Sequence, residues 1–319
     1  MTVGVDSNAV IPKMLEASGR CFSYYSHTKN LGYDGNVRFC LRAARGRYVF
    51  LLGNDDALAG PDTLAQIARM LQELDMPAVV FTNYEDWGSG EVVRRSLGTR
   101  VLGAGATAAV SNFRSLSFVS GLIYEQSWAA RHETDRWDQS IYYQVYIGCR
   151  ILAEGGRLGT LDLSAVRKDV RIEGQTVPNY ISRWANEPWS FQSRHTGLDS
   201  VIRVTADAVL PLLPIAQRSA AWRRIVAKVL LTTYPFWLFE YRRVSNWSFA
   251  AGIAREMWPG KMLKEQQTRL LDKAYLYVIY SVVTLIGLTL PLTLFYPVKS
   301  KLADLVRYLQ QSSVAVVQN

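Results

Sequence analysis

Short apolar runs alternate with longer amphipathic stretches along the first 175 residues. Runs such as 47–52 and 78–82 have the length of β-strands, whereas 62–74 repeats its apolar residues at the spacing of a helix. Strands that alternate with helices are typical of α/β sheets. We therefore expect strands at 2–5, 21–25, 47–52, 78–82, 118–124, 158–161 and 165–172, and helices at 9–18, 34–44, 62–74 and 139–154.

Local residue types refine two parts of this pattern. Asp34 precedes an amphipathic stretch, and we expect it to be the N-cap of the helix at 34–44. Residues 84–116 are rich in Gly, Ser and Arg, which predicts a long, partly ordered loop between two strands.

From about residue 178 the pattern becomes helical and basic, and we divide the chain into a domain at 1–177 and a helical region at 178–319. Residues 201–319 hold 15 of the 36 Lys and Arg residues but only 6 of the 27 Asp and Glu residues, so this region carries the whole net charge of +9. Such a basic surplus indicates an anionic partner, which is either a nucleic acid or a membrane.

The apolar segments favour a membrane over a nucleic acid. Residues 274–298 are uncharged throughout, with Lys273 before them and Lys299 after them, and about 20 apolar residues suffice to span a bilayer. The shorter segment 229–241 is flanked by arginines and suits a helix that lies among lipid headgroups. Two alternatives stay open: both segments form a buried helical hairpin, or 274–298 enters the bilayer and returns.

Two adjacent carboxylates stand at the end of a predicted strand, in the sequence LLGNDDAL at 51–58. Like charges side by side repel one another. Asp55 and Asp56 can bind a hard divalent cation that also takes diphosphate oxygens, or they can cap the helix that follows. Asp6 stands at the end of the strand at 2–5, so it is expected to face the same crevice at the carboxyl edge of the sheet.

Residues 30–58, NLGYDGNVRFCLRAARGRYVFLLGNDDAL, resemble the central signature of glycosyltransferase family 2. They are most similar to its abequosyltransferase-like branch, which reads N-x-G-x-x-x-N, a helix, G-x-Y and then LLGDDD-x-L. With VDSNA at 5–9 and SGLIYEQSW at 120–128, the resemblance extends over residues 3–175. It implies an α/β fold of the GT-A type, with a Rossmann-like, mostly parallel sheet, and an inverting enzyme that uses Mg²⁺ or Mn²⁺.

The resemblance also implies roles for individual residues. Asp56 matches the metal-binding position, and Asp55 matches the central acidic position. Asn54 stands where the family has a leading carboxylate, so it keeps an oxygen ligand but gives up a charge. The positions implied to bind the nucleotide-sugar are Asp6, Asn30, Gly32, Asn36, Asn54 and Asp55.

The general base and the start of the domain depart from the family pattern. Counting back from Arg150 places the family's base at Gln144, which cannot accept a proton at neutral pH. We expect Asp138 to replace it as the catalytic residue, with Asp135 and Glu133 as the next candidates, or else to cap the helix at 139–154. Because the family begins with a strand and a helix before the Asp6 segment, we expect the domain to be N-terminally truncated.

These observations predict a metal-dependent, inverting glycosyltransferase of bacterial surface polysaccharide synthesis. It would transfer a sugar from a nucleotide-sugar to a saccharide or polyprenyl-linked acceptor, with no nucleic acid as partner. It would lie at the cytoplasmic face of the inner membrane, bound to the membrane surface through 229–241 and 274–298. The alternative is a catalytically inactive, truncated relative that acts as a membrane-bound assembly partner. Tryptophans that could stack on a sugar are Trp87, Trp128, Trp137, Trp184 and Trp189.

Overall fold

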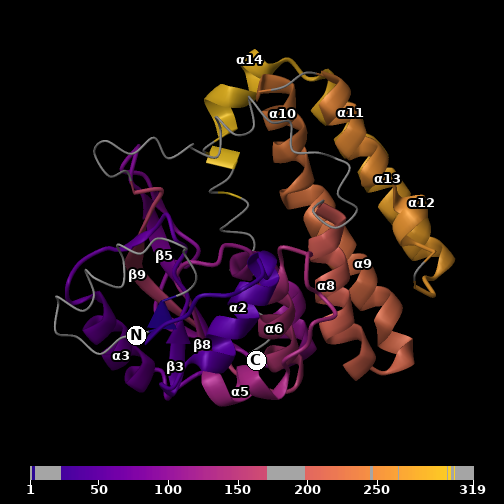
Figure 1. The fold of residues 1–319 in the computed structure, drawn as a ribbon. Coiled ribbons are helices and arrows are strands. Elements are labelled where there is room, and N and C mark those ends of the chain that lie inside the picture. The colour runs from indigo at the N-terminus through magenta and orange to yellow at the C-terminus, as the bar shows by residue number, and fades with distance from the viewer. Residues whose placement is uncertain are drawn as a thin grey trace.

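A computed structural model describes residues 2–3, 23–170, 198–244, 247–264, 266–299, 301–302 and 305 of the chain. The N-terminal part is a β-sheet with helices on both faces, and the C-terminal part is a group of helices beside it (Figure 1). Among these helices α8 lies next to the sheet part and α13 lies on the outer side.

Seven described strands form one mixed sheet. Its main path runs in the order β3 (Tyr48–Phe50), β8 (Leu122–Glu125), β5 (Val79–Asp86), β9 (Leu158–Lys168) and β4 (Ala57–Leu58). At its margins, β6 (Val92–Val93) pairs with β5, and β7 (Arg100–Gly103) pairs with β9. A separate parallel pair is formed by β1 (Thr2–Val3) and β2 (Ser23–Tyr24).

The expectation of a mostly parallel sheet needs correction. Within the seven described strands only β5 and β9 pair in parallel, and the other pairings are antiparallel. The apolar strand β8 inserts between β3 and β5 and runs opposite to both. As a result β3, β5 and β9 all run in the same direction.

Hydrophobic side chains pack on both sides of the sheet, so β5 is buried on both faces. Val79 and Phe81 belong to a large cluster with the helices on one side, whereas Val80 packs with Ile67 and Leu71 on the other. The helices of the N-terminal part are α2 (Gly32–Ala43), α3 (Thr63–Glu73), α4 (Gly105–Asn112), η1 (Phe113–Leu116), α5 (Gln126–Arg131) and α6 (Tyr143–Ala153).

Most predicted elements are present, with two errors. The segment 84–116 is not a loop, because it contains β6, β7, α4 and η1. The two late strands are one strand, β9, whose pairing with β5 shifts register around Asn83. The polar residues Asp162 and Ser164 lie near this irregularity and interrupted the apolar pattern. The predicted helix at 9–18 lies outside the described residues.

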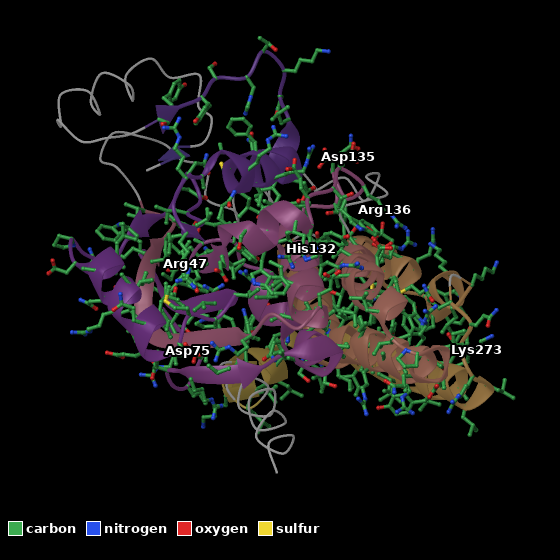
Figure 2. The ribbon with its side chains drawn as sticks, turned by 90° about the horizontal axis from the view of Figure 1, so that it is seen from below. Arg47, Asp75, His132, Asp135, Arg136 and Lys273 are labelled. Carbon is green, nitrogen blue, oxygen red and sulfur yellow. The ribbon has the colours of Figure 1, made fainter. Side chains whose placement is uncertain are left out.

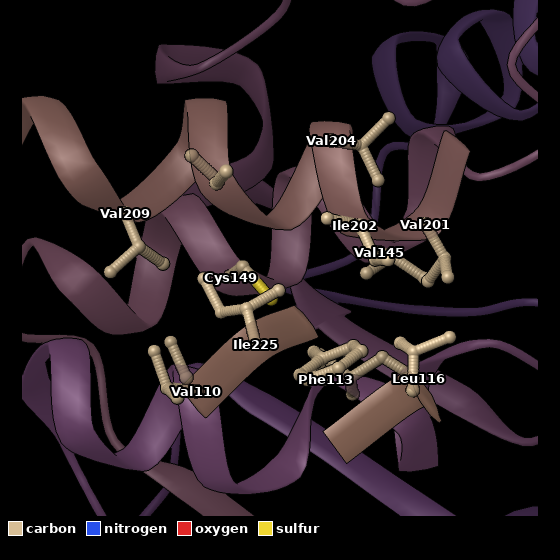
Figure 3. Packing of buried hydrophobic residues seen from close by; sticks show 14 of the residues in the cluster. Val110, Phe113, Leu116, Val145, Cys149, Val201, Ile202, Val204, Val209 and Ile225 are labelled. Carbon is tan, nitrogen blue, oxygen red and sulfur yellow. The ribbon is translucent and has the colours of Figure 1, made fainter. Parts of the chain in front are cut away.

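The C-terminal helices share one hydrophobic core with the sheet part. Figure 3 shows Val110 and Phe113 of the α4–η1 segment packed near Cys149 of α6, Val209 of α8 and Ile225 of α9. The helices of this region are α8 (Leu198–Val209), η2 (Leu210–Leu212), α9 (Ile215–Thr232), α10 (Tyr234–Val244), α11 (Trp247–Glu256), α12 (Pro259–Met262), α13 (Leu270–Thr289), α14 (Leu292–Phe295) and η3 (Tyr296–Val298).

The two predicted membrane segments differ in how they fold. Residues 229–241 are not one surface helix: they end α9 and form most of α10, and Val229, Tyr234 and Leu238 are fully buried. The prediction of a headgroup helix at 229–241 is therefore wrong, because the protein core takes up its apolar side chains. By contrast α13 is long and apolar enough to cross a membrane, and only 22% of an apolar stretch of 18 residues within it is buried.

Lys228 of α9 joins the helical region to the sheet part. Its Nζ donates a hydrogen bond to the carbonyl oxygen of Ser111 and lies 6.0 Å from the centre of the Phe113 ring. Burial, together with the positive charge of Arg114, lowers the pKa of Lys228 from 10.5 to about 8.

The pKa of Lys228 predicts a pH-dependent stability. Because the folded pKa lies below the unfolded value of 10.5, the unfolded chain binds more protons between pH 8 and 10.5, and the free energy of unfolding rises with pH in that window. Between pH 7 and 9.5, the free energy of unfolding of the wild type should rise by about 1 to 2 kcal/mol relative to that of Lys228→Met, measured by urea unfolding. The exposed control Lys261→Met should keep the wild-type pH dependence; identical curves for wild type and Lys228→Met would contradict the assignment.

Candidate functional site

The carboxyl ends of β3, β5 and β9 meet at one edge of the sheet, because the three strands run in the same direction. Asp55 and Asp56 follow β3, and Asp169 follows β9. Arg47 and Asp75, labelled in Figure 2, precede β3 and β5 and so lie at the opposite edge. The carboxylates therefore gather where ligands bind in open α/β sheets.

The turn after β3 folds both carboxylates over Gly53. A Cβ atom on Gly53 would lie 3.1 Å from Asp55 Oδ1 and 3.1 Å from Asp56 Oδ2. The two oxygens therefore converge on one point, and the glycine leaves the space beside them open. The backbone N–H of Asp56 donates to the Gly53 carbonyl oxygen at 3.3 Å and closes the turn.

Two segments that are distant in the sequence hold Asp56. Ser120 Oγ donates to Asp56 Oδ2 at 2.5 Å, and the backbone N–H of Asp169 donates to Asp56 Oδ1 at 3.0 Å. Ser120 Oγ also accepts a hydrogen bond from the Gly53 N–H at 2.8 Å. The Asp56 carboxylate is thus fixed in place, whereas Asp55 is exposed.

The electrostatics of this edge favour a cation. Burial raises the pKa of Asp56; the hydrogen bonds from Ser120 and Asp169 oppose this rise, and the charges of Asp55 and Asp169 add to it. Lys168 relieves part of the repulsion, since its ammonium contacts Asp169. Burial alone lowers the pKa of Lys168, but the contact with Asp169 outweighs burial and the pKa is raised.

The residues at this edge fit a divalent cation that is shared with a substrate. Within the described parts of the chain, no group of three or more His, Cys, Asp or Glu side chains is placed to hold a metal ion by itself. Mg²⁺ is commonly held by only one or two carboxylates together with substrate phosphates and water. The converging oxygens of Asp55 and Asp56 provide such a pair.

Three of the predicted nucleotide-binding residues lie at the start of α2. Asn30 Oδ1 accepts a hydrogen bond from the Gly32 N–H at 2.8 Å, and Gly32 has a φ of +67°, which glycine adopts readily. Asn36 Oδ1 is buried and has no hydrogen-bond partner among the described residues. Asn30 and Gly32 therefore shape the turn into α2, and Asn36 offers an acceptor for a ligand N–H or O–H group.

Asp138 lies beside α2. Its carboxylate pairs with Arg38 at 2.6 Å, and Glu133 lies 3.6 Å from the same guanidinium. The alternative role as a helix cap is excluded, because α6 begins at Tyr143 and its N-cap residue is Tyr142.

The expectation that Asp34 caps a helix is wrong. Asp34 is buried in the first turn of α2, and burial raises its pKa. Its carboxylate accepts hydrogen bonds from the N–H groups of Ile141 at 2.7 Å and Tyr143 at 2.9 Å. Ile141 has a φ of +59°, which is rare for a β-branched residue. Asp34 therefore holds the turn that follows Asp138 in a strained conformation.

Gln144, which the resemblance aligns with the family's base, is buried in the protein. Its Nε2 donates to the Ser117 carbonyl oxygen at 2.8 Å. This contact fixes the start of the segment 117–120, which ends at Ser120 beside Asp56.

The predicted site residues fall into two groups. Asp55 and Asp56 lie at the sheet edge, with Asn54 exposed in the same turn. The residues around α2 are Asn30, Gly32, Asn36 and Asp138. No hydrogen bond or ion pair between described residues joins the two groups. Asp6 lies outside the described residues.

Sequence reasoning missed Ser120 and Asp169, and it assigned Asp34 a wrong role. Asp169 follows β9, but the predicted strand continued to residue 172, so the argument from strand ends did not reach it. Ser120 carries no signal of its own, because its role depends on β8 lying beside β3. Asp34 was noticed, but its partners are more than 100 residues away in the sequence.

Among the tryptophans that the structure describes, Trp87 lies at the sheet edge. Trp87 follows β5, its side chain is 44% exposed, and its backbone N–H donates to the Lys168 carbonyl oxygen at 2.9 Å. Trp128 packs near His132, and the Nε1 of Trp137 donates to Asp207. The remaining candidates, Trp184 and Trp189, lie outside the described residues.

A family model described as "Glycosyl transferase family 2" matches residues 6–121 of this chain. The matched stretch contains the carboxylates of the β3 turn, the start of α2 and Ser120. It supports the resemblance to this family over these residues. A search of curated proteins finds no match.

The fold is similar to crystal structures of S. aureus TarS residues 1–349. The structure in complex with UDP has a TM-score of 0.53, and another TarS structure has a TM-score of 0.52. Each comparison covers 89% of this chain and 80% of that chain at 12% identity. The predicted fold class is therefore confirmed as a GT-A-like α/β fold with a helical C-terminal region, and its sheet is mixed.

The role of Asp34 predicts a stability loss on substitution. Asp34→Asn replaces one acceptor oxygen by an NH₂ group, which leaves a buried N–H of residue 141 or 143 without an acceptor. We expect a loss of about 1 to 3 kcal/mol in the free energy of unfolding, measured by urea titration at pH 7. The exposed Asp135, labelled in Figure 2, provides the control Asp135→Asn, which should change stability by less than about 0.5 kcal/mol. Equal stabilities of the two variants would contradict this role.

Proposed function

We propose that this chain is a glycosyltransferase that moves a sugar from a nucleotide-sugar donor to an acceptor hydroxyl. The observation that carries this proposal is the convergence of Asp55 and Asp56 over Gly53 at the carboxyl edge of the sheet. The family match over residues 6–121 includes this turn, and the similar TarS fold is known in complex with UDP. A donor with a nucleoside diphosphate is therefore the chemistry that these residues suit best.

Asp56, with Asp55 and Asn54 beside it, is the proposed ligand set for Mg²⁺ or Mn²⁺. Such an ion would neutralise the charge that builds up on the diphosphate leaving group. Ser120 and Asp169 hold the Asp56 carboxylate in one orientation. Asn54 contributes an oxygen without a charge, so this site relies on fewer negative charges than the LLGDDD pattern would supply.

Asp138 is the proposed general base of an inverting displacement. The acceptor hydroxyl gives its proton to the Asp138 carboxylate, its oxygen forms a bond to the anomeric carbon, and the bond from that carbon to the diphosphate breaks. In support, Asp138 lines a cavity of about 400 Å³ together with Trp137 and Trp222, a size in the range of small-molecule sites.

The acceptor is proposed to be a saccharide or a polyprenyl-linked saccharide of bacterial surface polysaccharide synthesis. The similarity of residues 30–58 to the abequosyltransferase-like branch supports this class. The exposed face of α13 supports an acceptor in a membrane. The enzyme is proposed to lie at the cytoplasmic face of that membrane. The apolar residues of this face are Leu271, Tyr275, Val278, Val282 and Leu285, all at least 46% exposed.

We propose that α13 lies along the membrane surface and does not cross the bilayer. The helix packs against α9 and α10, so a crossing α13 would carry these neighbours into the hydrocarbon. Both neighbours are basic, with Arg223, Lys228, Arg242 and Arg243 among their residues. Charged side chains at the centre of a bilayer are costly.

An inactive relative that acts as an assembly partner is the second candidate. The observation that favours it is Gln144, which is buried where the family has its base. If this second candidate is correct, the purified chain should consume no nucleotide-sugar, whatever metal is present.

Substitution of Asp56 tests the proposed chemistry. Purified wild type is screened with nucleotide-sugars for Mn²⁺-dependent thermal stabilisation, because a ligand that binds only the folded state raises its melting temperature. Asp56→Ala should lose this stabilisation and at least about 100-fold of the transfer rate. The control Asp75→Asn changes a carboxylate that is 89% exposed at the opposite edge of the sheet, and it should keep both the stabilisation and the transfer rate.

Full transfer by Asp56→Ala would refute the metal assignment. Absence of transfer by the wild type with every donor would favour the second candidate.

Substitution on α13 tests the membrane proposal. Val278→Asp combined with Leu285→Asp places two charges on the exposed apolar face, so binding to anionic lipid vesicles in a flotation assay should fall about tenfold or more. Leu64→Asp on α3, also about half exposed, is the matched control and should bind as the wild type does. Unchanged flotation of the double variant would exclude this face as the membrane contact.

A further inference from the structure

A cavity of about 320 Å³ lies between the sheet part and the C-terminal helices. Residues from β5, β6 and β7 and the segment 112–118 form one wall. The other wall is formed by Thr232, Thr233, Phe236 and Trp237, at the junction of α9 and α10. Neither the nucleotide site nor the cavity beside Asp138 includes this space.

The charge of the cavity is entirely positive. Four arginines line it, and no Asp or Glu is among its lining residues in the described part of the chain. Arg94 and Arg100 are exposed at its rim, whereas Arg95 and Arg114 are more buried. Burial and the charge of Arg114 also lower the pKa of the neighbouring Lys228, which is consistent with a positive field on this side of α9.

Arg95 organises the inner wall. Its guanidinium donates to the carbonyl oxygens of Thr82 at 2.7 Å, Phe118 at 2.9 Å and Ser120 at 2.8 Å. The rings of Tyr84 and Phe118 lie 5.5 Å and 5.4 Å from it. Burial lowers the pKa of Arg95 to about 10, so it remains charged at neutral pH and shapes the wall.

The segment 117–120 separates this cavity from the carboxylates at the sheet edge. The Ser120 carbonyl oxygen accepts from Arg95, and the Ser120 hydroxyl donates to Asp56. The cavity is therefore adjacent to the site proposed for the donor and has the opposite charge.

The outer wall connects the cavity to the helices of the membrane proposal. Phe236 lines the cavity, and its ring packs against that of Phe295 in α14 at 5.7 Å. Helix α10 also packs against α13, which carries the exposed apolar face. The arginine-lined cavity is thus followed by apolar side chains and then by the exposed apolar face of α13. This arrangement suits a ligand with an anionic head and an apolar tail.

We propose that the arginine cavity binds the phosphate or diphosphate group of the acceptor. Guanidinium groups bind phosphate oxygens in pairs of charge-assisted hydrogen bonds. Arg94 and Arg100 at the rim are the proposed phosphate ligands, and Arg95 and Arg114 add positive charge to the walls. The cavity thus adds a specificity element: an acceptor with a phosphate head is preferred over a neutral saccharide. This inference rests on the proposed function for the identity of the acceptor.

The test measures pyrophosphate binding by isothermal calorimetry on the full chain in low-salt buffer with EDTA. Without a divalent cation the carboxylates of the sheet edge repel an anion, so the measurement reports on the arginines. The double variant Arg94→Gln with Arg100→Gln should bind at least about tenfold more weakly. Arg95 is left unchanged because it holds the wall. Arg69→Gln, at an exposed arginine of α3, should bind as the wild type does, and so should Asp56→Ala.

Equal pyrophosphate binding by the double variant and the wild type would overturn the proposal. A second arm separates the acceptor from a general lipid headgroup, by flotation with phosphatidylcholine vesicles with and without phosphatidic acid. The double variant should float as the wild type does in both cases. Selective loss of flotation with phosphatidic acid would show that the cavity binds membrane lipid, which overturns the acceptor assignment.

The same variants separate this proposal from the proposed function. Where a donor and an acceptor are found, the double variant should raise the KM for a phosphate-bearing acceptor at least about tenfold and leave the KM for the donor unchanged. If no nucleotide-sugar is used but pyrophosphate binding falls in the double variant, the phosphate site stands and the glycosyltransferase proposal fails.

Discussion

The common direction of β3, β5 and β9 is the constraint on which the rest of the site depends. The parallel pairing of β5 with β9, and the antiparallel insertion of β8 between β3 and β5, set this direction. It brings the turn after β3 next to the end of β9, where the Asp169 N–H reaches Asp56. A reversed β3 would place Asp55 and Asp56 at the opposite edge, beside Asp75 and away from the end of β9.

Charge is then separated across a thin wall. The carboxylates of Asp55, Asp56 and Asp169 gather on one side of the segment 117–120, and four arginines gather on the other. Ser120 contacts both sides, since its hydroxyl donates to Asp56 and its carbonyl accepts from Arg95. Under the two proposals, a metal-bound diphosphate would occupy the acidic side and a phosphate without metal would occupy the basic side.

The elements of the fold could be predicted from local patterns, but their arrangement could not. Helix α3 and strand β5 follow directly from apolar spacing, whereas the insertion of β8 depends on pairings between residues such as Val80 and Ile123 that are far apart in the sequence. The segment 84–116 was mistaken for a loop because its short strands β6 and β7 are stabilised by pairing with β5 and β9 and by few apolar residues of their own. Composition alone gives no sign of such pairing.

The same division holds for the site. The turn at Asp55 and Asp56 could be found because two adjacent carboxylates after a strand are unusual, and its metal role stays a prediction. For Asp34, the sequence pattern predicted the nearby helix correctly but the role of the residue wrongly. Its carboxylate accepts hydrogen bonds from the N–H groups of Ile141 and Tyr143 and does not cap α2. A buried carboxylate with two backbone N–H partners is held more firmly than an exposed cap. The turn before α6 therefore depends on α2, and the position of Asp138 beside Arg38 depends on both.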